Sequence, residues 1–302
     1  MLPATRGTPP DRPAPATPRP VRPLAKASSD MRLMVLGCSG QLARSLTAAA
    51  DGGDITLTAL GRPQLDLTRP EMVTAAILTA KPDAVINAAA YTAVDRAESE
   101  PEAAYRLNAE GPAAAARATA QIGVPLIHVS TDYVFDGSKA QPYLEGDPTG
   151  PTGVYGASKL AGEVAVAAAN PRHVIVRTAW VFSPYGHNFL KTMLRLASER
   201  SELAVVDDQR GSPTYAPDLA AALIGIARAV AGAAADDARF GIYHATNRGE
   251  ASWADFAVAI MQEAQRRGRP GVPVRRITTA EFPTPTRRPA NSRLDVGRLA
   301  RG

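Results

Sequence analysis

From residue 31 to residue 178, short apolar runs alternate with segments of helical hydrophobic periodicity. The apolar runs predict five strands, at residues 32–36, 55–60, 84–86, 124–129 and 173–178. Predicted helices lie between them, at residues 41–50, 70–79, 101–120 and 154–169. Strands that alternate with helices of this length form right-handed βαβ units. The pattern therefore predicts an α/β fold built on a parallel sheet with helices on both faces.

Beyond Ala179 the alternation loosens, which is typical of a second, smaller domain placed over the ends of the strands. We predict a Rossmann-like, doubly wound domain at residues 31–180 that also takes in part of residues 208–235, and a second portion at residues 181–302. Residues 1–30 contain eight prolines and few residues able to form a core. Because proline removes a backbone donor and disfavours helix before it, this segment is predicted to be a disordered extension.

Composition and charge exclude several classes of protein. Five basic and two acidic side chains give residues 1–30 a charge of +3, so the other 272 residues carry only +2 of the total of +5. A body so nearly neutral argues against a nucleic-acid partner. No apolar run approaches the roughly 18 residues of a membrane span, and no secretory signal core is present. We therefore expect a cytoplasmic protein without a membrane partner.

Cysteine and histidine usage predicts neither disulfides nor a metal site. The single cysteine cannot form a disulfide within the chain, and the four histidines occur in no CxxC or HExxH pattern. A chain of 302 residues buries enough apolar surface to fold without either kind of crosslink.

A glycine-rich turn follows the first predicted strand. The spacing Gly37-x-x-Gly40-x-x-Ala43 lets the backbone turn tightly into a helix. A pyrophosphate can then approach the helix N-terminus, where unpaired N–H groups attract anions. Alone, such a turn also occurs without a nucleotide. Its place at the first βα junction favours dinucleotide binding.

The region after the second strand indicates which dinucleotide. An acidic residue there would accept hydrogen bonds from the ribose of NAD, whereas arginine favours the 2′-phosphate of NADP. Arg62 occupies this region and no acid does. NADPH is therefore the predicted cofactor, with NADH possible, although Arg62 in a solvated loop would fit the sequence equally well.

Polar and small residues gather where the third and fourth strands end. The small residues of segment 87–92 (NAAAYT) would let a nicotinamide ribose lie against the backbone, although they also suit the start of an Ala-rich helix. Ser130 and Thr131 place a hydroxyl pair at the carboxyl edge of the sheet, where open α/β sheets bind ligands.

Tyr155 and Lys159 are spaced to share one face of a helix. A tyrosine with an ordinary pKa near 10 is a weak acid at neutral pH. A nearby ammonium stabilises its phenolate and is expected to lower that pKa. By itself the pair is compatible with an ordinary surface contact. Its position after the glycine turn, the small-residue segment and the hydroxyl pair favours catalysis.

Taken together, these segments resemble the extended short-chain dehydrogenase/reductases, and among them the dTDP-4-dehydrorhamnose reductases. The resemblance runs from residue 31 to about residue 294. It is carried by residues 87–100 (NAAAYTAVDRAESE), 130–137 (STDYVFDG), 154–162 (VYGASKLAG), 177–181 (RTAWV), 188–199 (NFLKTMLRLASE), 208–214 (DQRGSPT) and 287–294 (RRPANSRL).

This resemblance implies a role for each matching residue. The cofactor would contact Gly40, Gln41 and Leu42 through its pyrophosphate, Asp66 and Leu67 near its adenine, and Ala90, Tyr91 and Thr92 along its ribose. Tyr155 would be the general acid, Lys159 its partner and a ribose anchor, and Thr131 a hydrogen-bond donor to the sugar carbonyl. Asp132 would also contact the sugar, and Trp180 would pack an apolar face against it, although a core indole fits that position equally well.

The implied reaction is NADPH-dependent reduction of the C4 ketone of dTDP-4-dehydro-β-L-rhamnose to dTDP-β-L-rhamnose, the last step of dTDP-L-rhamnose biosynthesis. Residues 31–180 would bind NAD(P), and residues 181–302 would bind the nucleotide sugar. Two alternatives share the turn and the Tyr-Lys pair: a nucleotide-sugar epimerase, and a non-catalytic NADP-binding regulatory subunit. Segments 177–181 and 287–294 favour the reductase over the epimerase.

Two departures from the family bear on assembly and length. Some members dimerise through a magnesium ion held by glutamates, but Ser45 and approximately Pro217 stand at those positions here. We therefore predict no metal site, and a monomer or weak homodimer. Family chains usually continue beyond the segment at 287–294, so the second portion is expected to be short at its carboxyl end.

Overall fold

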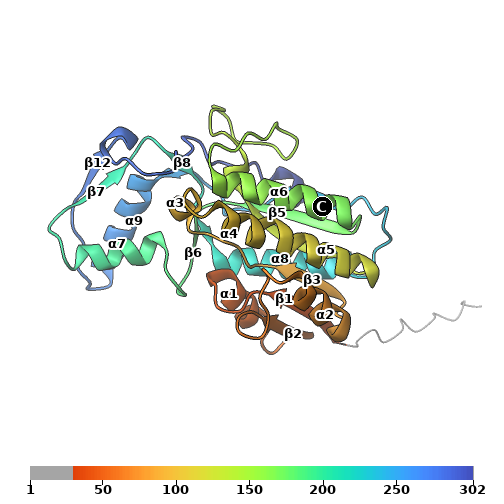
Figure 1. Ribbon diagram of the computed structural model, residues 1–302. Helices are drawn as coiled ribbons and strands as arrows, with labels where there is room; N and C mark the ends of the chain where they lie inside the picture. The colour runs from red at the N-terminus through yellow and green to blue at the C-terminus, as the bar shows by residue number, and fades with distance from the viewer. Residues whose placement is uncertain (1–29, 302) are drawn as a thin grey trace, which may run out of the picture.

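A six-stranded parallel sheet forms the centre of the protein, seen in a computed structural model that describes residues 30–301 (Figure 1). The strand order is β10-β5-β4-β3-β1-β2, and every pair is parallel. The strands are β1 (Met31–Leu36), β2 (Ile55–Leu60), β3 (Ala84–Asn87), β4 (Leu126–Thr131), β5 (His173–Thr178) and β10 (Gly241–His244). The chain order reverses between β1 and β3, so the predicted doubly wound α/β fold is confirmed.

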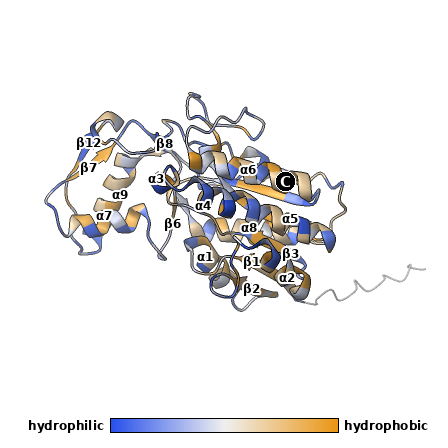
Figure 2. Ribbon diagram, viewed as in Figure 1, coloured by the Kyte–Doolittle hydropathy of each residue, from blue (hydrophilic) through white to orange (hydrophobic). Residues whose placement is uncertain are grey.

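Two helical layers bury both faces of this sheet. One face packs against α1 (Gln41–Ala50) and α8 (Ala216–Val230), and the other against α2 (Pro70–Ala80), α5 (Gly111–Gln121) and α6 (Val154–Ala169). Alternation along β1 divides its side chains between the two cores, Leu33 and Val35 to one and Met34 and Leu36 to the other. A strand that is buried on both faces reads as a continuous apolar run, which explains the sequence pattern. Figure 2 shows the hydrophobic colouring concentrated on these strands.

A smaller unit lies beside the carboxyl ends of the strands (Figure 1). Its core joins α7 (Phe189–Ala197) and α9 (Trp253–Arg266) to the parallel pair β7 (Leu203–Val206) and β12 (Val274–Ile277). Short strand pairs connect it to the sheet: β6 (Val181–Phe182) with β9 (Thr214–Tyr215), and β8 (Arg210–Gly211) with β11 (Ala251–Ser252). Because α8 and β10 return to the sheet, we propose that residues 216–244 belong to the nucleotide-binding unit.

The predicted helix at residues 101–120 is wrong in one respect, because it is interrupted. It consists of α4 (Pro101–Tyr105), a π-helical turn (Arg106–Glu110) and α5. Pro112 has no N–H to give to a regular helical ladder, and the wider turn aims the buried Asn108 inward. Gly162 of α6 accommodates this turn, since a Cβ there would come within 2.1 Å of the Asn108 carbonyl oxygen.

The fourth strand also differs from its prediction. It begins at Leu126 rather than Val124 and continues through Ser130 and Thr131, which pair in register with Arg177 and Thr178 of β5. The hydroxyl pair is therefore held by the sheet itself instead of following it.

The remaining elements are short, and the extension lies outside the described residues. The short elements are α3 (Val94–Ala97), α10 (Gly297–Arg301) and 3₁₀ turns at Asp132–Val134 and Thr279–Glu281. The predicted disorder of residues 1–30 falls, except for Asp30, on residues that the structure does not describe. Among residues 30–301, no helix is both long and apolar enough to cross a bilayer.

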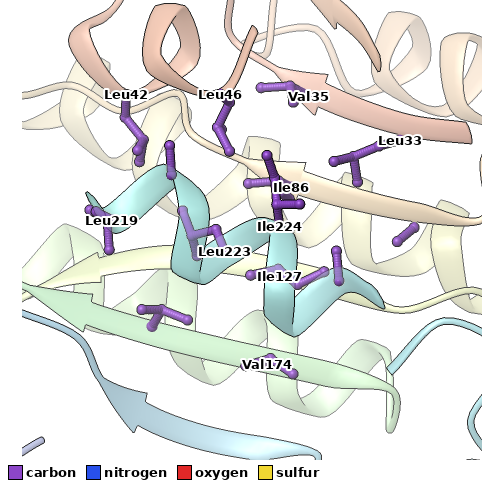
Figure 3. Close-up of a cluster of buried hydrophobic side chains, with 14 of the residues drawn as sticks. Leu33, Val35, Leu42, Leu46, Ile86, Ile127, Val174, Leu219, Leu223 and Ile224 are labelled. Atoms are coloured by element: carbon purple, nitrogen blue, oxygen red, sulfur yellow. The ribbon is translucent and has the colours of Figure 1, made fainter. Parts of the chain in front are cut away.

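Leu223 tests the contribution of the core between α8 and the sheet. Its side chain is fully buried beside Leu219 and Ile224 (Figure 3). We expect Leu223→Ala to lower the free energy of unfolding by about 2–5 kcal/mol, because it leaves a cavity as well as removing buried methyl groups. Leu144→Ala removes the same groups from a half-exposed loop side chain and should cost less than about 1 kcal/mol. Urea denaturation of both variants measures the difference, and equal losses would contradict this assignment.

Candidate active site

A cleft of about 680 Å³ runs along the carboxyl ends of β1 to β5. This is the edge at which open α/β sheets bind ligands. Its walls come from the turn after β1, the segments after β2 and β3, the end of β4, the first turns of α6 and the segment after β5. Residues separated by more than a hundred positions therefore meet in one cavity.

The glycine turn has the geometry of a phosphate cradle. Gly37 has a φ of +106°, which side chains rarely tolerate, and a Cβ there would come within 3.3 Å of Ala89. Gly40 is the N-cap of α1, has nothing within 4 Å of the position of a Cβ, and leaves the first N–H groups of the helix without a side-chain cap. Open space in front of unpaired helix N–H groups fits a pyrophosphate.

The side chains of Gln41 and Leu42 are engaged in contacts within the protein, so mainly their backbone groups face the cleft. The Gln41 side-chain oxygen accepts hydrogen bonds from Ser183 at 3.0 Å and from Asn188 at 2.9 Å. The Leu42 side chain belongs to the core between α1 and the sheet. A cofactor could therefore use only the N–H groups of these two residues within the helix N-terminus.

The segment after β2 forms one end of the cleft. Arg62 is exposed, lines the cleft and has no ion-pair partner among residues 30–301. Asp66 accepts hydrogen bonds from the N–H and hydroxyl of Thr68, which hold the pKa of its carboxyl below the usual range. Leu67 is buried. The guanidinium of Arg62 is thus a free cation at this end.

After β3, the structure separates residues that the resemblance grouped together. Ala90 and Thr92 line the cleft. The Tyr91 side chain points away from it, donating a hydrogen bond from its hydroxyl to Glu100 at 2.6 Å. Asn108 holds the Tyr91 backbone in place by accepting from its N–H at 2.7 Å and donating to its carbonyl at 3.2 Å. Sequence reasoning missed Asn108, whose only signal is a lone amide in an Ala-rich stretch.

Thr131 and Tyr155 meet where β4 ends and α6 begins. Gly156 lets the helix lie against this strand end, because a Cβ there would come within 2.1 Å of the Tyr133 carbonyl oxygen. The Tyr133 ring packs edge-on against Tyr155, with centroids 5.4 Å apart. Desolvation raises the pKa of Tyr155, and a hydrogen bond with Thr131 opposes that rise only in part. The phenol is therefore held in its protonated form.

Lys159 is buried one turn further along α6. Its Nζ donates to the Val129 carbonyl oxygen at 2.7 Å and lies 3.5 Å from His128 Nε2. Burial lowers the pKa of Lys159 to about 8, and the Glu163 carboxylate opposes that fall. The expectation that Lys159 lowers the Tyr155 pKa is not met here, since desolvation outweighs the other influences on the phenol.

Asp132 and Trp180 supply the other polar and apolar groups of the cleft. Asp132 Oδ2 is buried without a hydrogen-bond partner, and burial raises the pKa of this carboxyl to about 6. Trp180 lines the cleft with a φ of +50°, but Trp253 stacks on one face of its indole at 3.5 Å. Gly211 lies so close that a Cβ would come within 2.3 Å of the indole Cε2. The apolar face expected to meet the sugar is thus partly occupied by protein.

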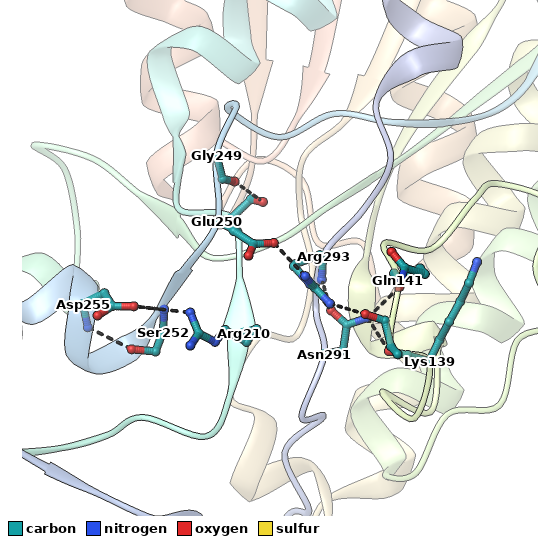
Figure 4. A network of polar contacts seen from close by, with 11 residues as sticks. Lys139, Gln141, Arg210, Gly249, Glu250, Ser252, Asp255, Asn291 and Arg293 are labelled. Carbon is teal, nitrogen blue, oxygen red and sulfur yellow. Dashed lines mark hydrogen bonds and ion pairs between the residues drawn. The ribbon is translucent and has the colours of Figure 1, made fainter.

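The segment at 287–294 packs behind residues of the cleft and does not line it. Asn291 donates to the carbonyls of Lys139 and Gln141, and Arg293 pairs with Glu250 (Figure 4). Arg288 in turn donates to the Tyr133 hydroxyl at 3.0 Å and pairs with Asp95. Within residues 30–301, no cluster of metal-ligating side chains is found.

The chain contains only two tryptophans, so spectroscopy isolates the stack of Trp180 on Trp253. We expect Gly211→Ala to displace the indole, changing near-UV circular dichroism and tryptophan emission at a stability cost of about 1–3 kcal/mol. Gly225→Ala is the matched control, because a Cβ at that exposed position of α8 meets nothing within 4 Å. Unchanged spectra for Gly211→Ala would contradict the close packing.

Comparison with known proteins gives a consistent result. A family model described as the RmlD substrate binding domain matches residues 31–301. A dTDP-4-dehydrorhamnose reductase of Sinorhizobium fredii is 51% identical over 271 residues, which cover 90% of this chain and 91% of that protein. The Escherichia coli K12 protein of the same name is 46% identical over 233 residues, 76% of this chain and 77% of its own.

Solved structures agree. The dTDP-4-dehydrorhamnose reductase of Bacillus anthracis in complex with NADP has a TM-score of 0.83 at 36% identity, covering 90% of this chain and 92% of that chain. The UDP-glucose 4-epimerase of Thermus thermophilus, in complex with NAD, is 19% identical with a TM-score of 0.72. It covers 90% of this chain and 92% of its own, and at that identity the likeness shows a shared fold alone.

Proposed function

Because the chain belongs to the family of dTDP-4-dehydrorhamnose reductases, we propose that its cleft reduces the C4 ketone of dTDP-4-dehydro-β-L-rhamnose to dTDP-β-L-rhamnose with NADPH. This is the last step of dTDP-L-rhamnose biosynthesis. The observation that carries the proposal is the meeting of Thr131, Tyr155 and Lys159 in the same cleft as an uncapped, glycine-cradled helix N-terminus. Family membership favours this reaction over the epimerase and the regulatory subunit.

The residues present fit NADPH. Gly37, Gly40 and the N–H groups at the start of α1 would hold the pyrophosphate, and Arg62 the 2′-phosphate. The segments around Asp66 and Thr92 would flank the adenine and ribose ends. When bound, NADPH supplies the hydride that reduces the ketone.

The protein itself moves one proton and stabilises charge. Tyr155 donates its hydroxyl proton to the ketone oxygen as that oxygen becomes an alkoxide, which is a stronger base than the phenolate left behind. The Thr131 hydroxyl donates a hydrogen bond to the same oxygen, where negative charge accumulates in the transition state. The ammonium of Lys159 would anchor a ribose hydroxyl of the cofactor.

Asp132 and Trp180 orient the sugar. The unpartnered Asp132 Oδ2 accepts a hydrogen bond from a sugar hydroxyl, which would remove an otherwise costly buried acceptor. The exposed part of the Trp180 indole packs against the deoxysugar.

Tyr155→Phe tests the acid. Loss of the phenolic proton should lower kcat by about 10²- to 10⁴-fold, while the affinity for NADPH changes little. The measurement is the loss of NADPH absorbance with dTDP-4-dehydro-β-L-rhamnose. Tyr105→Phe, a change on the exposed face of α4, is the control and should retain full activity. A wild-type protein that binds NADPH but consumes none would overturn the reductase assignment.

Arg62→Ala tests the cofactor phosphate site. Removal of one charge-assisted contact should raise KM for NADPH by about 10- to 100-fold and leave KM for NADH nearly unchanged. Arg69→Ala removes a cation from the same segment that is already paired with Glu71, so it serves as the control. Equal effects on both cofactors would place the 2′-phosphate elsewhere.

The oligomeric state and the cellular location of the protein are also proposed. We propose a monomer or weak homodimer, since Ser45 and approximately Pro217 stand where some family members have the glutamates of a bridging magnesium site. Light scattering after gel filtration measures this directly. A cytoplasmic location likewise remains a proposal.

A further inference from the structure

Glu163 is a buried carboxylate at the junction of three elements. Only 3% of its side chain is exposed, and it lies on α6 one helical turn beyond Lys159. Its oxygens accept four side-chain hydrogen bonds: from the Ser130 hydroxyl at 2.5 Å, and from Arg177 at 2.7, 3.0 and 3.2 Å. A buried carboxylate that accepts this many hydrogen bonds is fixed in position.

The partners of Glu163 lie directly beside the reacting groups. Ser130 of β4 immediately precedes Thr131 and pairs in register with Arg177 of β5. The same carboxylate therefore ties the strand end that carries Thr131 to the helix that carries Tyr155 and Lys159. No role in the reaction assigned above uses this link.

Glu163 is the only acidic residue of α6, and it shares one face of the helix with Lys159. The titratable side chain of β4 that faces Lys159 is His128, and burial keeps this imidazole neutral by lowering its pKa. Arg177 of β5 is a second buried cation, and it pairs with Glu163 at 2.7 Å. Asp132 faces Tyr155, and Glu98 binds the N–H of Val154 at the start of the helix. The other charged residues of the elements packed on α6 are Asp95, which pairs with Arg288, and the exposed Arg96, Glu102, Arg106, Glu110 and Arg117.

We propose that Glu163 is a positioning residue of the reductase site: clamped by Arg177 and Ser130, it keeps Lys159 in the ammonium form and holds Thr131 beside Tyr155. The inference deepens the proposed function and rests on the roles given there to Lys159 and Thr131. Burial alone drives Lys159 toward the neutral amine. Without the carboxylate, two buried cations would remain with no anion between them.

The direct test is the titration of Lys159 in lysine-labelled protein by NMR, with its signal assigned by its absence from Lys159→Met. In the wild type, the ammonium form dominates below the Lys159 pKa of about 8 and is lost above it. In Glu163→Gln we expect that loss about one pH unit lower or more. The pH at which NADPH affinity falls should move down by the same amount. Neither measurement requires the sugar substrate.

Matched variants separate charge from structure. Glu163→Asp retains the charge and should keep the titration of Lys159 near its wild-type position. Ser130→Ala retains the ion pair, so it should leave the titration unchanged while lowering kcat through a looser Thr131. If Glu163→Gln does not fold, the double variant Glu163→Gln/Arg177→Met removes both buried charges. Its Lys159 should still titrate below wild type, because the double variant also lacks the carboxylate that raises the pKa of Lys159.

A Lys159 titration unmoved in Glu163→Gln, or in the double variant, would overturn the proposal and leave Glu163 a structural ion pair. Failure of the proposed function is a separate result: the wild type would then consume no NADPH with the sugar, whatever the titration of Lys159 shows.

Discussion

Burial of both faces of the parallel sheet is the constraint on which the rest of the structure depends. With α1 and α8 on one side and α2, α5 and α6 on the other, the strands can offer side chains to a ligand only at their ends. The parallel direction brings the carboxyl ends of β1 to β5 to one edge. The cleft, the glycine turn and the side chains proposed to be catalytic all lie there for this reason.

Desolvation then determines the chemistry of that edge. It raises the pKa of Tyr155 and of Asp132 and lowers that of Lys159, so each group is pushed toward its neutral form. For the Tyr155 phenol, this direction preserves the protonated form but makes it a weaker proton donor. For Lys159, desolvation disfavours the ammonium form, and the Glu163 carboxylate opposes this effect. In this proposal, the buried ion pair of Glu163 and Arg177 has a role in positioning and charging Lys159, in addition to any contribution to stability.

The smaller unit completes the site through contacts that span the chain. Trp253 of α9 backs Trp180, and the segment at 287–294 reaches across to the loop containing Lys139 and to Tyr133. Contacts between the two units therefore hold two of the aromatic residues that line the cleft, Trp180 and Tyr133.

Local pattern was enough to predict much of the protein. Hydrophobic periodicity gave strand and helix positions mostly within two residues, because an element's period depends on its own buried face. The glycine turn and the spacing of Tyr155 and Lys159 were also readable, since a tight turn and one helix face need only near neighbours. The roles of the side chains in the cleft came from the family resemblance rather than from these patterns.

What only the tertiary structure decided involves partners distant in the sequence. Gln41 turns its side chain to Asn188, 147 residues away, and so leaves only its backbone for the cofactor. Tyr91 faces Glu100 because Asn108, in a π-helical turn that proline and packing impose, holds its backbone. One face of the Trp180 indole is covered by the stacked ring of Trp253. The sequence by itself determined the elements and the reactive groups, because these follow from local periodicity and residue chemistry. The directions of the side chains were decided by the packing of elements that meet only in the folded chain.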